Sequence, residues 1–76
     1  MLLLAVESTS LVSISYATEQ SVLELEFRDG SVYSYIEVPP ECVHELIAAD
    51  SKGAYFNRHI RNRFRCQRVS GHQEEN

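Results

Sequence analysis

The 76-residue chain has no tryptophan, only two cysteines, two prolines and three glycines. Cys42 and Cys66 lie far apart without C-x-x-C spacing, so the chain lacks the disulfide framework of small secreted domains. We therefore expect reduced thiols and a cytoplasmic location. Residues 1–6 form an apolar run that ends at Glu7. A membrane span needs roughly 20 apolar residues, so this run predicts neither a membrane segment nor a signal peptide.

Positive charge is scarce before residue 52 and acidic residues are absent from 52–68. Residues 1–51 hold nine acids and one cation, Arg28, and the formal net charge is -4. The basic segment, residues 52–68, holds six cations: Lys52, Arg58, Arg61, Arg63, Arg65 and Arg68. This asymmetry points to a polyanionic partner, although the overall charge argues mildly against one.

Seventy-six residues are enough for one small domain with a thin stability margin. Domains of this size often depend on a staple, a metal or a second subunit, and we expect a homodimer. The apolar arm 1–6 predicts an extra strand, either buried in a subunit interface or packed against the chain's own sheet.

Alternation of apolar and polar residues with period two predicts a meander of three antiparallel strands, over 11–16, 21–28 and 31–36. In the first strand, this alternation places Val12, Ile14 and Tyr16 on one face. Asp29-Gly30, between the second and third strands, favours a tight hairpin because glycine tolerates positive φ.

The sequence Val38-Pro39-Pro40 ends the sheet and suits the first turn of a helix. The helix is predicted over 41–49, because its apolar residues recur at spacings of three and four: Val43, Leu46 and Ile47.

A second helix is predicted to begin at Asp50-Ser51, whose side chains can cap it. Its core-facing residues follow at i, i+4 and i+8: Phe56, Ile60 and Phe64. If this helix continued to residue 65, one ridge would carry three cations: Arg58, Arg61 and Arg65. We expect it to end near Asn62, and the alternating segment 63–69 allows a fourth strand.

The predicted fold class is therefore α+β: a three-stranded antiparallel meander followed by two helices, with a fourth C-terminal strand as an option. One domain spans 1–69, and 70–76 is expected to be a disordered polar tail.

Several segments together resemble the KTSC domain family, across about residues 8–69. They are Val32-Tyr33-Ser34-Tyr35, Val38-Pro39, the segment 49–57 (Ala-Asp-Ser-Lys-Gly-Ala-Tyr-Phe-Asn) and Ile60-Arg61. The resemblance implies a small α+β domain, alone or at the C-terminus of some lysyl-tRNA synthetases, with a role in nucleic-acid biology and no catalytic residues to transfer. The leucine arm and the density of arginines after Ile60 depart from a typical member.

We expect non-catalytic nucleic-acid binding, because arginine forks onto phosphate and aromatic rings stack on bases. The predicted contact residues are Lys52, Tyr55, Asn57, Arg58, Arg61, Arg63, Arg65 and Arg68. Gly53 is weighed as a phosphate contact or a packing position, and the sequence does not separate DNA from RNA. The alternative is a protein-interaction module in which acidic and basic regions pair.

No enzymatic activity is expected. His44, His59 and Cys66 lie at no metal-ligand spacing, and no nucleophile accompanies a base in a known motif. We therefore predict no cofactor, no metal, no membrane contact and no small-molecule substrate.

Overall fold

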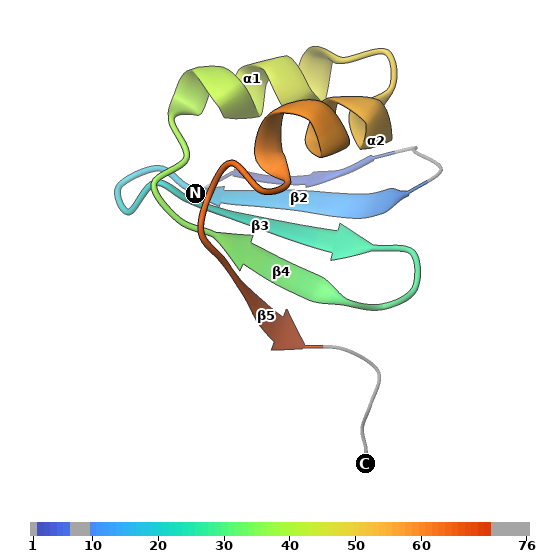
Figure 1. The fold of residues 1–76 in the computed structure, drawn as a ribbon, viewed down its shortest axis with the longest axis horizontal. Coiled ribbons are helices and arrows are strands. Elements are labelled where there is room, and N and C mark those ends of the chain that lie inside the picture. Colours follow the sequence, from blue (N-terminus) through green and yellow to red (C-terminus); the bar gives the residue numbers. More distant parts are fainter. Residues whose placement is uncertain (1, 7–9, 71–76) are drawn as a thin grey trace.

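The computed structural model describes residues 2–6 and 10–70, and shows a five-stranded antiparallel sheet with helices over one face (Figure 1). The strands lie side by side in chain order. The elements are β1 (Leu2–Ala5), β2 (Leu11–Ala17), β3 (Val22–Phe27), β4 (Val32–Tyr35), α1 (Pro40–Ala48), α2 (Lys52–Tyr55), the π-helical turn η1 (Phe56–Ile60) and β5 (Cys66–Ser70).

The predicted fold class is confirmed, and the sheet is wider than the three predicted strands. Those three strands are β2, β3 and β4. The apolar arm supplies β1, which pairs with β2, and the ambiguous segment 63–69 supplies β5, which pairs with β4. Of the predicted tail, Ser70 ends β5, and residues 71–76 lie outside the described part of the chain.

One strand face was predicted incorrectly at its first residue. Leu11 is fully buried, whereas Val12 is 36% exposed. The register of β2 against β3 shifts between Leu11 and Ser13. Such a bulge places an extra residue in one strand, so the alternation before it is reversed relative to the alternation after it. Ile14 and Tyr16, beyond the bulge, are buried as expected.

The Val-Pro elbow after β4 is fixed by hydrogen bonds to β2 and to the turn between β2 and β3. The Tyr16 hydroxyl donates to the Val38 carbonyl oxygen at 2.6 Å, and the Val38 amide donates to the Ser21 carbonyl oxygen at 2.9 Å. Val38 itself is fully buried. The elbow therefore turns the chain from the end of β4 back over the sheet, where α1 buries Val43 and Leu46.

The second helix starts as predicted and ends two residues early. The Ser51 hydroxyl accepts a hydrogen bond from the Ala54 amide at 3.2 Å, as a capping side chain does. The last helical bond runs from the Arg61 amide to the Phe56 carbonyl oxygen at 2.8 Å. Asn62 then takes a positive φ of 65°, and the Arg63 amide donates to the Ile60 carbonyl oxygen. This is a type II turn, and asparagine is one of the residues that tolerate its third position.

No helix among the described residues is long and apolar enough to cross a membrane.

Candidate nucleic-acid interface

The structure divides the basic segment among three places on the surface. Because the helix ends at Ile60, the condition for a ridge of Arg58, Arg61 and Arg65 is not met, and Arg65 does not continue a ridge with the other two. Arg61 lines a pocket against the sheet, whereas Arg63 and Arg65 line a second hollow with Ile36, Glu37 and Phe64. Arg58 lines a third hollow, between α2 and the end of α1.

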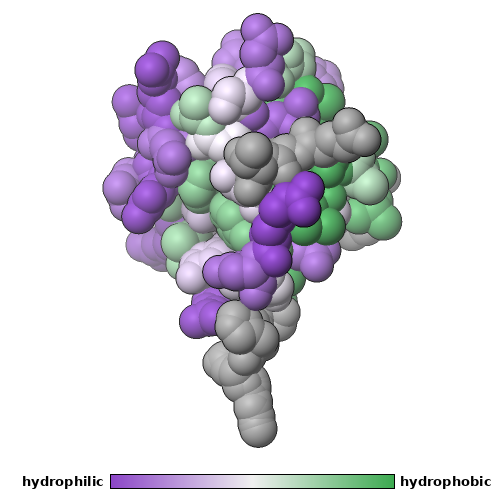
Figure 2. All heavy atoms as spheres, turned by 90° about the vertical axis from the view of Figure 1, so that its right-hand side faces the viewer, coloured by the Kyte–Doolittle hydropathy of each residue, from purple (hydrophilic) through white to green (hydrophobic). Residues whose placement is uncertain are grey.

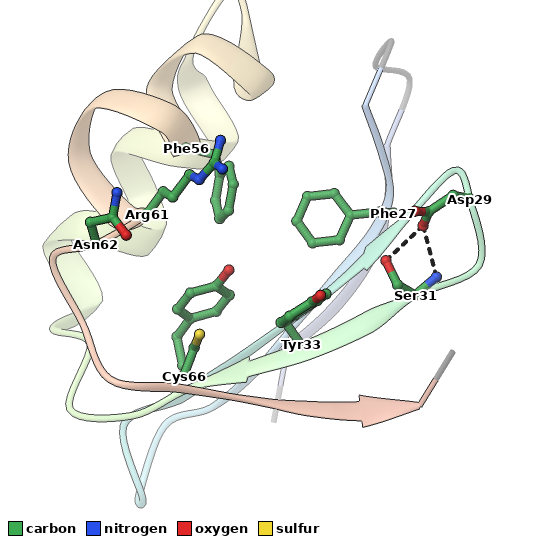
Figure 3. Close-up of a pocket in the computed structure, with 9 residues that line it drawn as sticks. Phe27, Asp29, Ser31, Tyr33, Phe56, Arg61, Asn62 and Cys66 are labelled. Carbon is green, nitrogen blue, oxygen red and sulfur yellow. Dashed lines mark hydrogen bonds between the residues drawn. The ribbon is translucent and has the colours of Figure 1, made fainter. Parts of the chain in front are cut away.

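The pocket at Arg61 lies where the helical layer stops short of β4 and β5, and its volume is about 410 Å³ (Figure 3). Phe56 and Arg61, from the helical side, face Tyr33 and Cys66 on the sheet. The lining residues are Phe27, Asp29, Ser31, Tyr33, Tyr35, Phe56, Arg61, Asn62 and Cys66.

Four aromatic rings form a connected cluster along this pocket. The Phe27 ring centroid lies 5.9 Å from that of Tyr33 and 5.2 Å from that of Phe56. Tyr35 meets Phe56 at 5.7 Å. All three contacts are edge-to-face, a favoured geometry for aromatic pairs. Phe56 and Tyr35 are buried, whereas Phe27 and Tyr33 are half-buried. Phe27 and Tyr33 are therefore held in place by ring contacts and still expose part of their surface to a ligand.

Arg61 is held over the pocket by the type II turn and by Asn57. Its Nη1 donates to Asn57 Oδ1 at 3.4 Å, a long contact at an exposed position.

Burial is the main reason that the pKa of Tyr35 is raised to about 12, with the nearby Cys66 thiol contributing and the Arg61 charge opposing the shift. Tyr35 thus stays a neutral hydroxyl beside the Arg61 cation at neutral pH.

The far rim of the pocket is the β3–β4 hairpin, and it was predicted correctly as a tight turn. Gly30 has a φ of 93°, the positive φ that was predicted for this glycine. Asp29 Oδ1 accepts hydrogen bonds from the Ser31 amide at 2.9 Å and from the Ser31 hydroxyl at 2.6 Å. The rim is therefore a rigid Asx-type turn with its carboxylate at the pocket.

Strand β5 brings a second arginine to the pocket side of the sheet. Arg68 pairs with Tyr33, and Cys66 pairs with Tyr35. Residues directly opposite each other in a ladder share a face, so Arg68 emerges on the face that carries Tyr33. Cations from both ends of the segment 61–68 thus flank the aromatic cluster.

The arginines of the basic segment are not neutralised by the acidic strands. Across residues 2–6 and 10–70, no ion pair joins Arg58, Arg61, Arg63, Arg65 or Arg68 to a carboxylate. Glu26 instead accepts a hydrogen bond from the Ser13 hydroxyl, at 3.1 Å. Among these residues, the arginines therefore form no intramolecular ion pair with Glu24 or Glu26.

Three other predicted contact positions serve the helical layer. Lys52 Nζ donates to the Ala49 carbonyl oxygen at 3.2 Å, and the Tyr55 hydroxyl donates to Glu45 Oε1 at 2.7 Å. Burial, reinforced by the hydrogen bond to Glu45, raises the pKa of Tyr55. A Cβ on Gly53 would lie 2.8 Å from Ser10 Oγ, so the glycine lets α2 approach the chain before β2. This supports the packing role for Gly53.

Sequence reasoning missed most of the pocket. It placed Phe56 on the core-facing side of the second helix, and it used Tyr33 and Tyr35 only for the resemblance to a family. Their spacing of two on β4 carried the signal, because such residues share a face of a sheet. Asn62 was used only as a helix boundary. Within the described residues, no group of three His, Cys, Asp or Glu side chains could hold a metal ion.

Comparison with known proteins decides the family. The model of the KTSC domain matches residues 7–64. The chain belongs to the KTSC domain family. A KTSC domain protein from Yersinia pestis has the same fold in its crystal structure, with a TM-score of 0.87 and 30% identity, covering 91% of this chain and 97% of that one.

Two sequence relatives of this KTSC domain differ in size. An uncharacterised protein of Stutzerimonas stutzeri is 50% identical over 54 residues, which are 71% of this chain and 76% of the relative. A lysine–tRNA ligase of Nostoc punctiforme is 38% identical over 68 residues, which are 90% of this chain but 12% of the ligase. The same domain therefore occurs in a small protein and as a minor part of a large enzyme.

Proposed function

We propose that this KTSC domain is a non-catalytic nucleic-acid-binding protein that holds a single strand of RNA or DNA. The observation that carries the proposal is an aromatic-lined pocket that has Arg61 in its wall, and in which the lining residue Tyr33 pairs across the ladder with Arg68. Positive charge that follows a backbone, combined with aromatic rings that bases can stack on, is the usual arrangement of single-strand-binding surfaces.

The arginines form no ion pair with a carboxylate within residues 2–6 and 10–70, and this supports the same function. A guanidinium group on the surface that has no acidic partner is available to bind phosphate. The similarity to a segment of a lysine–tRNA ligase favours RNA over DNA, by analogy of domain neighbourhood alone. A cytoplasmic location is part of this proposal.

A homodimer is also proposed, through β1. This strand ends the order of the sheet, so its outer edge pairs with no described strand, and Leu3 is 72% exposed. Hydrophobic residues gather along one side of the surface in Figure 2, opposite the more hydrophilic side. An exposed apolar edge strand readily pairs with another strand. Leu3→Lys should convert the dimer to a monomer in sedimentation experiments, and an unchanged molecular mass would place the interface elsewhere.

Fluorescence anisotropy with single- and double-stranded DNA and RNA, at two salt concentrations, tests the proposed function. If Arg61 and Arg68 neutralise two phosphates, the log–log salt slope on single strands is about -1.4, since each contact contributes about -0.7. Arg61→Glu should weaken binding strongly. Arg58→Glu makes the same change in net charge at a separate hollow and serves as the matched control.

Two outcomes would contradict the proposal. No retention of any oligonucleotide at low salt would remove nucleic-acid binding and favour the alternative, a protein-interaction module that uses the β1 edge. Equal losses in Arg61→Glu and Arg58→Glu would show that only net charge matters, and that the pocket side of the sheet is not the contact surface.

A further inference from the structure

We propose that the pocket beneath Arg61 receives one unpaired nucleobase of the bound strand. This inference rests on the function proposed above and assigns its base-binding subsite. The pocket lies between the end of η1, the β3–β4 hairpin and β5, and three of its four aromatic rings come from outside the basic segment.

The volume and the walls suit a base. Ligand pockets in proteins commonly measure about 300–1,000 Å³, and this one, at about 410 Å³, is at the small end of that range. Its lining combines the half-buried rings of Phe27 and Tyr33 with the buried rings of Phe56 and Tyr35. Such walls favour a flat, aromatic guest over a hydrated phosphate.

The polar groups at the rim suit the edge of a base. Arg61 and Asn62 stand on the helical side of the pocket (Figure 3), and Tyr35 on β4 also lines it. A guanidinium group can donate to the ring nitrogens and carbonyl oxygens of a base or stack on its face. A side-chain amide both donates and accepts, which matches the mixed edges of nucleobases. An aliphatic lipid chain would leave these groups unsatisfied.

The charges around the pocket indicate where the backbone of the strand runs. Arg68 stands opposite Tyr33 on the neighbouring strand, so a phosphate next to a base at Tyr33 would meet a cation. Asp29 lies at the hairpin rim, where its carboxylate accepts hydrogen bonds from the Ser31 amide and hydroxyl. The phosphates are therefore placed along β5 at Arg68 and beside Arg61, and the base points toward the hairpin and η1.

The test separates stacking from charge with substitutions at Tyr33. Tyr33→Thr removes the ring but keeps a residue that favours strands, and Tyr33→Phe keeps the ring and removes the hydroxyl. For a single-stranded octamer, Tyr33→Thr should weaken binding roughly tenfold, within the range measured for loss of one base–aromatic stack. Tyr33→Phe should bind within about twofold of the unmodified protein, and the salt slope should be the same in all three.

A second variant fills the pocket without removing any part of the core. Cys66 is an exposed thiol on β5 that lines the pocket, so Cys66→Phe adds a ring inside it. We expect a similar, roughly tenfold loss of affinity for the octamer. Urea unfolding of each variant confirms that it is folded before binding is measured. One variant removes a ring and the other adds one, so an equal loss of affinity in two folded variants points to the pocket that both of them change.

An abasic octamer completes the experiment. The unmodified protein should prefer the normal octamer, whereas Tyr33→Thr and Cys66→Phe should bind both strands equally. If normal and abasic strands bind the unmodified protein alike with a clear salt slope, the base pocket is wrong while the proposed function stands. If no strand binds at low salt, the proposed function itself fails.

A titration with nucleoside monophosphates, followed by amide NMR shifts, distinguishes a strand from a free nucleotide. Under this proposal, millimolar nucleotide shifts the amides of Tyr33, Tyr35 and Cys66, and the octamer shifts them at much lower concentration. If the monophosphate binds as tightly as the octamer, the pocket belongs to a free nucleotide and the strand assignment is overturned. If the octamer binds without shifting the amides of the pocket residues, the strand assignment is also overturned.

Discussion

The two ends of the sheet use their aromatic residues differently. Over β2, the helical layer closes on the sheet: Tyr16 is 2% exposed and its hydroxyl is bonded to the Val38 carbonyl oxygen. The helical layer does not extend over β5 (Figure 1), and Tyr33 on β4 stays half-buried in the wall of a pocket. One sheet thus has a covered end that stabilises the fold and an open end that can bind a ligand.

The largest expected effect is at the covered end. Leu46, a residue of α1, is fully buried, so Leu46→Ala should lower the free energy of unfolding by about 2–5 kcal/mol. That is a large share of the about 5–15 kcal/mol that holds a typical domain together. Tyr33→Thr at the open end should cost clearly less. Urea denaturation followed by circular dichroism measures both, and equal losses would mean that the open end is part of the core.

A smaller effect is expected from the matched pair Tyr16→Phe and Tyr33→Phe. The first leaves the buried Val38 carbonyl without its donor, which should cost about 1–3 kcal/mol. The second removes a hydroxyl at the half-buried ring and should change the unfolding free energy by less than about 0.5 kcal/mol. If Tyr16→Phe leaves the free energy of unfolding unchanged, the Val-Pro elbow does not depend on this hydrogen bond.

Next in size is the turn that aims Arg61. Asn62 has a positive φ, so Asn62→Gly should be tolerated, while the β-branched Asn62→Val should cost about 1–2 kcal/mol. Because the turn positions Arg61, the valine variant should also lose oligonucleotide affinity in anisotropy measurements. If a folded Asn62→Val protein keeps its full affinity for the oligonucleotide, the turn at Asn62 is not needed for binding.

The smallest effect appears only at alkaline pH. In the folded protein, the pKa of Tyr35 is raised from its ordinary value of 10.0 to about 12. The neutral hydroxyl is thus favoured in the folded state. Stability from this group is complete below pH 10 and is lost as pH rises through about 12. Unfolding midpoints measured across this window should fall less steeply in Tyr35→Phe. Part of the fall in the unfolding midpoint should persist in this variant, because the pKa of Tyr55 is also raised. If the midpoint falls equally steeply with pH in both proteins, the assignment to Tyr35 is contradicted.

The sequence predicted the α+β order because its signals were local. Period-two alternation marked β2, β3 and β4, the spacing of Phe56 and Ile60 marked the second helix, and Ser51 marked its cap. It also located the basic segment. It misjudged Val12, because a bulge is a property of a strand pair and leaves no mark in the alternation of one strand.

What tertiary structure alone decided was where the arginines and aromatic rings meet. The sequence determined that residues 52–68 are basic and that their first half packs on the core. A positive φ at Asn62, the pairing of Arg68 with Tyr33 and the end of the helix at Ile60 then set the directions of the side chains. Composition and periodicity report which residues are buried. A pocket depends on which segments come together, and that is fixed only when β5 returns to pair with β4.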